Sequence, residues 1–172
     1  MTKENPFRGE RHYTSTVLVV AEQKPRTVLL VHHKKLGKWM PPGGHQEDTE
    51  NPYEAAVRET KEETGIDISG FLPKPVPIDD RAFYLPVPQY ILEEKIDAHG
   101  NHFEHYHLDM IYVVYLPQQQ VNHQESESHS IGWFTQEEVE NLPIFENVLI
   151  LIKTVFGLSN TVGLSSNKQQ HG

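Results

Sequence analysis

Apolar and β-branched residues along the chain form short runs with strand-like composition and, near residues 51–64, a run with a helical period. Turn-forming stretches, Gln23-Lys24-Pro25 and His99-Gly100-Asn101, separate two neighbouring pairs of the strand-like runs, so each pair is expected to form a hairpin. The predicted strands are residues 14–21, 26–33, 90–96, 104–116 and 131–134.

The clearest helix signal has a marked beginning and end. Asn51 is suited to the N-cap, Pro52 to the first helical position, and Glu54 completes a capping box. Gly65 is placed to end the helix in the left-handed conformation. The face expected to pack on a sheet carries Tyr53, Ala56, Val57, Thr60 and Thr64.

Two stretches rich in Pro or Gly, residues 37–44 and 73–88, are predicted to be loops. Thr135 is expected to cap a brief helix, and residues 143–156 to form the last helix. Strands combined with one early and one late helix indicate an α+β fold, a mixed sheet in an α/β/α sandwich rather than a βαβ repeat.

The chain of 172 residues is expected to form one domain over residues 1–157, with frayed residues 1–11 at its start. Residues 158–172 are rich in Ser, Asn and Gln and have little to bury, so we expect a flexible C-terminal tail there.

The charge balance and the lack of cysteine exclude several classes of function. Fifteen Lys+Arg against 24 Asp+Glu give a formal net charge of −9, which argues against a large nucleic acid as partner. With no cysteine there is no disulfide, thiolate metal site or cysteine nucleophile. Neither a signal peptide nor a membrane-spanning run is evident, so we expect a cytoplasmic protein that acts on a small molecule.

Three glutamates stand out within the predicted helix. Glu59, Glu62 and Glu63 have i, i+3, i+4 spacing, which places their carboxylates on one face. Like charges on adjacent turns destabilise a helix, and anions near its C-terminus oppose the macrodipole. A hard divalent cation such as Mg²⁺ or Mn²⁺ would make the same arrangement favourable and would allow an acidic protein to bind a diphosphate.

Taken alone, the three glutamates are more typical of a solvated acidic helix face than of a metal site. The i, i+4 spacing of Arg58 to Glu62 indicates that the guanidinium braces the carboxylates rather than binding substrate. It is the wider spacing of fixed residues around the helix that favours the metal site.

Residues 44–66 match G-x5-E-x7-R-E-U-x-E-E-x-G-U, where U is apolar, at every fixed letter. This pattern is the Nudix box, and the chain resembles the MutT-like Nudix hydrolase superfamily. Thr60, at the first apolar position, is the one departure, and it affects packing rather than metal binding. The resemblance implies a mixed sheet between helices, with the box as loop–helix–loop.

The resemblance also implies a pyrophosphatase that hydrolyses a nucleoside diphosphate linked to another group, such as a nucleotide sugar, a dinucleoside polyphosphate, an NDP-ribose or an NTP. The catalytic residues and metal ligands for Mg²⁺ or Mn²⁺ would be Glu59, Glu62 and Glu63, with the Gly44 carbonyl as a further ligand. Glu50 would support the loop, and Arg58 and Gly65 would be structural. Relatives often add one carboxylate from outside the box, for which the candidates are Glu104, Glu125 and Glu127.

Substrate-binding candidates lie outside the helix: Trp39, His45, Tyr84 and His107. His105, His107 and Asp109 alternate along one predicted strand, which indicates either a cleft-lining polar group or a transition-metal site. The substrate itself stays open, and a homodimer is expected only from the resemblance. A Nudix-fold binding or regulatory module without catalysis is the alternative function, which the intact glutamate set disfavours.

Overall fold

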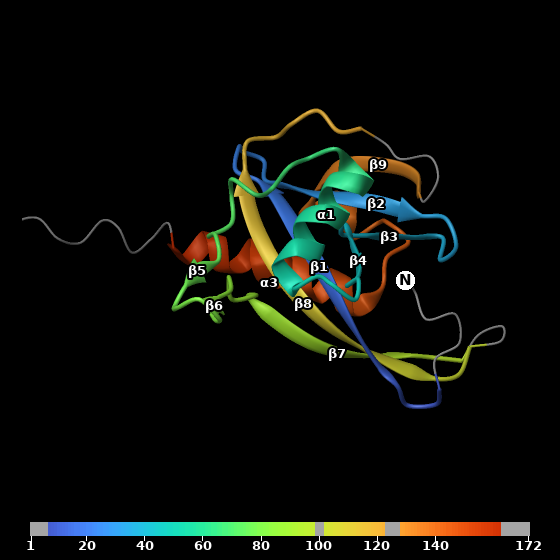
Figure 1. Ribbon diagram of the computed structural model, residues 1–172. Coiled ribbons are helices and arrows are strands. Elements are labelled where there is room, and N and C mark those ends of the chain that lie inside the picture. The colour runs from blue at the N-terminus through green and yellow to red at the C-terminus, as the bar shows by residue number, and fades with distance from the viewer. Residues whose placement is uncertain (1–6, 99–101, 123–127, 163–172) are drawn as a thin grey trace, which may run out of the picture.

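The computed structural model describes residues 7–98, 102–122 and 128–162, with side chains up to residue 157. Its elements are shown in Figure 1. In chain order they are β1 (Arg11–Ala21), β2 (Thr27–His33), β3 (Lys38–Met40), β4 (Gly43–His45), α1 (Pro52–Thr64), β5 (Val76–Pro77), β6 (Phe83–Tyr84), β7 (Tyr90–Ile96), β8 (His105–Leu116), β9 (Ser128–Thr135), α2 (Gln136–Val139) and α3 (Glu146–Val162).

Seven strands, two more than expected, form one sheet, and the sheet is mixed as predicted. The strand order is β3-β2-β1-β8-β7, with β4 paired to β1 and β9 paired to β2. β1 and β8 are parallel from Arg11 to Ala21, whereas the other pairs in this sheet are antiparallel. The β7–β8 hairpin forms as expected. β1 and β2 pair only next to their turn, because β4 takes the place beside β1 further along.

Helices cover both faces of the sheet, which confirms the sandwich (Figure 1). Successive side chains of a strand point to opposite faces, so β1 contributes to two cores. Val17 and Val19 pack in the core cluster that contains Ala56 of α1. Leu18 packs in the other cluster, which contains Ile152 of α3. The α1 side and the α3 side of the sheet are therefore distinct surfaces.

The boundaries of α1 follow the local sequence. The Asn51 side chain accepts a hydrogen bond from the Glu54 N–H at 3.1 Å, and the Glu54 carboxylate accepts one from the Asn51 N–H at 3.0 Å. Pro52 opens the helix, and Gly65 closes it with φ of 77°, donating its N–H to the Lys61 carbonyl at 2.9 Å. The predicted capping box and glycine cap are confirmed.

Gly65→Ala is expected to lower the free energy of unfolding by about 1–2 kcal/mol, because a side chain is strained at positive φ. An added Cβ would also lie 3.0 Å from the Asn122 Cβ. Chemical denaturation would measure the change. Gly70→Ala is the control, since nothing lies within 4 Å of a Cβ added there; equal stability of the two variants would contradict the prediction.

The prediction of a loop over residues 37–44 was wrong, because β3 and most of β4 lie in this range. β3 pairs with β2 and β4 pairs with β1. Gly and Pro lower strand propensity, but neighbouring strands supply the backbone hydrogen bonds. Gly43 has φ of 156°, and a Cβ on it would approach the Ser15 carbonyl oxygen to 2.5 Å. The glycine thus permits the close approach of β4 to β1.

The predicted loop at residues 73–88 also contains a short antiparallel pair. Val76 lies opposite Tyr84 and Pro77 opposite Phe83, which forms a separate two-stranded sheet from β5 and β6. Its four residues are exposed, so no apolar alternation marks them in the sequence.

The start of the sheet was placed too late in the sequence. β1 begins at Arg11 rather than residue 14, and Glu10, expected to be frayed, is only 6% exposed. The reason is tertiary: β8 extends to His105 and gives the first residues of β1 a parallel partner. Similarly, β9 spans eight residues because it pairs with all of β2.

The C-terminal elements follow the predicted order. Thr135 caps α2, its hydroxyl accepting from the Glu138 N–H at 3.3 Å. α3 runs from Glu146 to Val162, so the first residues of the expected tail are helical, and residues 163–172 lie outside the described part. Within the described residues, no helix has both the length and the apolar character needed to cross a membrane.

Candidate functional site

Two of the three glutamates of α1 contact the glycines of β4, Glu63 at Gly43 and Glu59 at Gly44, and the three differ in exposure. Glu63 is 7% exposed, and its carboxylate accepts a hydrogen bond from the Gly43 N–H at 3.0 Å. The side chain of Glu59 is 14% exposed and that of Glu62 is 53% exposed. The spacing therefore produces one shared edge with a buried, a half-buried and an exposed carboxylate.

Arg58 lies at the centre of this edge. Its Nε and Nη2 donate to the two Glu50 oxygens at 2.6 and 2.9 Å. Its Nη1 donates to Glu59 at 2.8 Å and to Glu62 at 3.0 Å, and its Nη2 also reaches the His45 carbonyl at 3.1 Å. The hydrogen bond to Glu50, with smaller contributions from Glu59 and Glu62, raises the Arg58 pKa further above its ordinary value. The same bond lowers the pKa of Glu50.

Because Gly44 has no side chain, the Glu59 carboxylate lies close to the Gly44 backbone. A Cβ on Gly44 would lie 2.6 Å from Glu59 Oε1. Thr60, at the position where the box has an apolar residue, is fully buried and donates its hydroxyl to the Ala56 carbonyl at 2.8 Å. The hydroxyl that Thr60 brings to this apolar position is therefore satisfied by a hydrogen bond within the helix.

The donor set of this edge fits a hard divalent cation. Three glutamates, Glu50, Glu59 and Glu62, bind the Arg58 guanidinium, and Glu63 lies on the same helix against Gly43, so negative charge exceeds positive charge at this edge. All candidate ligands are oxygens, which Mg²⁺ and Mn²⁺ prefer. In this conformation Arg58 engages Glu59 and Glu62, so the guanidinium and a cation would share these carboxylates.

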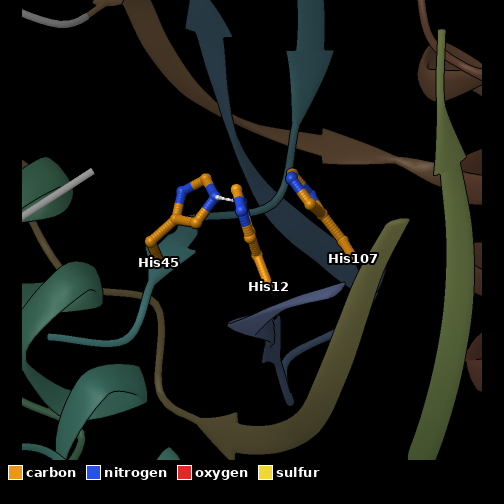
Figure 2. Close-up of side chains that lie close together, drawn as sticks. All are labelled: His12, His45 and His107. Carbon is orange, nitrogen blue, oxygen red and sulfur yellow. Dashed lines mark hydrogen bonds between the residues drawn. The ribbon is translucent and has the colours of Figure 1, made fainter. Parts of the chain in front are cut away.

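A second set of ligand-type side chains converges on the other face of the sheet. Ring nitrogens of His12, His45 and His107 all lie within 4.8 Å of one another. Figure 2 shows the three rings side by side, His45 from β4, His12 from β1 and His107 from β8, with a contact of 3.4 Å between His12 Nδ1 and His45 Nε2. Within the part of the chain that the structure describes, these three histidines are the group of potential metal ligands whose ligand atoms all lie within 4.8 Å of one another, and we call them the histidine cluster.

Burial and the neighbouring rings lower the pKa of two members of the cluster, His107 and His45. Burial lowers the pKa of His107 to about 3, with further contributions from the neighbouring His45, His105 and His12. Burial also lowers the pKa of His45, followed by the effects of His12 and His105.

His105, His107 and Asp109 lie on one face of β8 as predicted, but these three do not form the metal-ligand set that was one of the two alternatives. Asp109 is not in the histidine cluster: it accepts a hydrogen bond from the Thr14 hydroxyl at 2.9 Å. The His105 ring contacts the Phe103 carbonyl through Nδ1 at 2.9 Å. His12 is the third histidine of the cluster. The pattern along β8 alone could not indicate it, because β1 lies beside β8 only in the folded sheet.

Asp109 instead lines a pocket between the sheet and α3. Burial raises the pKa of Asp109, and burial followed by the Asp109 charge raises that of Glu94. Asn147 of α3 donates to the Glu94 carboxylate at 2.6 Å. The pocket is lined by Thr16, Met40, Pro41, Leu92, Glu94, Asp109, Ile111, Asn147, Val148 and Leu151. The sequence pattern did not single out Glu94 or Asn147, which are ordinary surface-type residues until the fold joins them.

Two aromatic candidates lie away from this pocket. Trp39 packs edge-on against Phe134, with ring centroids 4.7 Å apart, in the cluster on the α3 side. Tyr84 is 66% exposed on β6. Their assignment to substrate contact stays a prediction.

Of the additional carboxylate candidates, Glu104 is paired with Lys95 at 2.8 Å, and the hydrogen bond from Lys95 lowers its pKa. Glu125 and Glu127 lie outside the described residues.

Comparison with known proteins places these features in a family context. The family model described as NUDIX domain matches residues 11–150. The crystal structure of a NUDIX-family hydrolase from Clostridium perfringens is similar, with 30% identity and a TM-score of 0.66, covering 87% of this chain and 98% of that chain.

Two further similarities involve proteins named for one substrate class. A C. elegans Ap4A hydrolase binary complex has 17% identity and a TM-score of 0.60, covering 87% of this chain and 98% of that one, and supports the fold alone. The mouse bis(5'-nucleosyl)-tetraphosphatase [asymmetrical] is 51% identical over 39 residues, which is 23% of this chain and 23% of the mouse protein.

Proposed function

The chain belongs to the NUDIX family of hydrolases, and from this we propose that it hydrolyses a phosphoanhydride bond in a nucleoside diphosphate linked to another group. In this reaction a water oxygen bonds to one phosphorus, and the bridging oxygen leaves with the other phosphate. The observation that carries the proposal is the carboxylate edge of α1, where Glu59 and Glu63 lie against the Gly43–Gly44 backbone.

We assign Glu59, Glu62 and Glu63, with the Gly44 carbonyl, to the binding of Mg²⁺ or Mn²⁺, in keeping with the general use of divalent metals in this family. When bound, such an ion neutralises charge on the phosphates and acidifies water. Glu63 is positioned by the Gly43 N–H and Glu59 by Arg58. Either carboxylate is placed to orient or deprotonate the attacking water, and the choice between them stays open.

The pocket beneath α3, whose lining includes Pro41 two residues before Gly43 of the carboxylate edge, is the proposed place for the part of the substrate that does not react. Glu94 and Asp109 accept hydrogen bonds when ionised and also donate them when protonated, and the raised pKa of each favours the protonated form. Such groups suit the polar edge of a nucleobase. Dinucleoside polyphosphates come first among the candidate substrates, because the mouse protein that matches 39 residues at 51% identity is named for this substrate class.

The substrate would be tested on a panel of Ap4A, ADP-ribose, a nucleotide sugar and nucleoside triphosphates, each with Mg²⁺ or Mn²⁺. Product masses in isotopically labelled water identify both the bond cleaved and the phosphorus attacked. We expect metal-dependent turnover of at least one compound. Tight nucleotide binding with no turnover of any compound would instead support the regulatory module.

Gly44→Ala is expected to lower kcat/KM about tenfold or more, because the new Cβ must displace the Glu59 carboxylate. The free energy of unfolding should change little, since the displaced atoms are the end of a flexible side chain. Steady-state kinetics would measure the effect, with Gly70→Ala as the control in open space. Unchanged kinetics in Gly44→Ala would argue against a role for the Glu59 position.

A further inference from the structure

We infer that His12, His45 and His107 form a second metal site, one for a transition-metal dication such as Zn²⁺, separate from the carboxylate edge. Three strands, β1, β4 and β8, each supply one ligand (Figure 2). The site does not depend on the proposed hydrolysis, and its ligands are nitrogens rather than oxygens.

The spacing of the rings suits tetrahedral coordination. With Zn–N bonds of about 2.0–2.1 Å, two ligand nitrogens of a tetrahedral ion lie about 3.3 Å apart. His12 Nδ1 and His45 Nε2 are 3.4 Å apart, and one nitrogen of each of the three rings lies within 4.8 Å of one nitrogen of the other two. A small movement of the His107 ring would complete three ligands, leaving the fourth position for water.

The sheet register holds the three residues in place. His12 is directly opposite His107 in the parallel β1–β8 pair, and His45 is opposite Thr14 on the other side of β1. Side chains at positions i and i+2 of a strand share a face, so all three rings lie on the α3 side of the sheet. The rings are therefore fixed by strands rather than by loops.

Polar atoms in the histidine cluster lack hydrogen-bond partners. Nε2 of His107 and Nε2 of His12 are both buried and have none among the described residues. A buried polar atom without a partner costs about 1–3 kcal/mol. Coordination would satisfy the His107 nitrogen, and the lowered pKa values of His45 and His107 favour the neutral form that binds metals.

A carboxylate lies behind one of the proposed ligands. Glu10 Oε2 is 3.4 Å from His12 Nε2, at ion-pair distance but outside hydrogen-bond geometry, and the two side chains are 6% and 10% exposed. Binding of a metal through Nδ1 would leave Nε2–H to donate to Glu10. This is the carboxylate–histidine–metal arrangement that orients ligands and increases their basicity.

The site is tested by titrating untagged protein with Zn²⁺ and Co²⁺ in saturating Mg²⁺, which competes for the carboxylate edge but poorly for imidazole. We expect elemental analysis of the protein by mass spectrometry to find one bound Zn²⁺ per chain. Co²⁺ should give the intense visible bands of a tetrahedral nitrogen-ligated ion. A wild-type protein without stoichiometric Zn²⁺, or with only the weak Co²⁺ bands of octahedral coordination, would overturn the inference.

His12→Gln and His107→Gln are each expected to weaken Zn²⁺ binding at least about tenfold. His33→Gln, at the end of β2 outside the histidine cluster, is the matched control and should bind as wild type does. Glu63→Gln should retain the Zn²⁺, which separates this site from the proposed catalytic metal. If the folded His12 and His107 variants bound Zn²⁺ as tightly as the wild type does, the inference would be overturned. If a variant does not fold, the Co²⁺ spectrum of the wild-type protein decides whether the site exists.

Discussion

Glu63→Gln is expected to lower kcat/KM at least about hundredfold with the substrate identified by the panel, because it removes a negative charge from the proposed metal site. The glutamine oxygen is still able to accept the Gly43 N–H hydrogen bond that Glu63 accepts at 3.0 Å. The fold should therefore survive, and thermal unfolding should stay near that of the wild type. Glu62→Gln should reduce turnover to a similar extent despite its greater exposure.

The matched control for this prediction is Glu54→Gln. It changes the same atoms on the same helix, at the N-terminal end, and glutamine also suits that capping position. We expect its kinetics to equal those of the wild type. Full activity in both Glu62→Gln and Glu63→Gln would count decisively against catalysis at the carboxylate edge.

Arg58→Gln should lower the free energy of unfolding by about 2–4 kcal/mol in the absence of divalent metal. The change removes the bidentate pair with Glu50 and the bonds to Glu59 and Glu62, leaving the carboxylates to repel one another. Mg²⁺ should restore part of the loss, because binding to the folded state stabilises it and supplies the missing positive charge. Denaturant unfolding with and without Mg²⁺ measures both effects.

Arg11→Gln provides the comparison for Arg58. Arg11 makes an exposed ion pair with Glu93 at 2.9 Å, with side chains 54% and 48% exposed. Exposed pairs contribute little, so a change within about 0.5 kcal/mol is expected. If the two variants unfolded alike, Arg58 would not be the residue that holds the carboxylate edge together.

Local chemistry explains why α1 was predicted closely. Asn51, Glu54 and Gly65 act within a few residues of themselves, so their capping roles are independent of the rest of the fold. The common face of the three glutamates follows from helix geometry in the same way. The alternation of residues 17–20 between two cores likewise follows from the period of a strand.

Pairing between distant segments explains what was predicted wrongly. β4 is rich in glycine and forms a strand only because β1 supplies its hydrogen bonds. The first residues of β1 are ordered because β8 runs parallel to them. A propensity within one short segment contains no information about such a partner.

The sequence by itself determined the α+β class, the limits of α1 and the glutamate spacing that identifies the family, because the type of each element and the caps of a helix depend on neighbours along the chain. The tertiary structure alone decided that Arg58 binds Glu50 together with Glu59 and Glu62, and that His12 joins His45 and His107 rather than Asp109. The physical reason is register: the alignment of β1 between β4 and β8 sets which side chains meet, and this alignment results from the packing of the whole sheet.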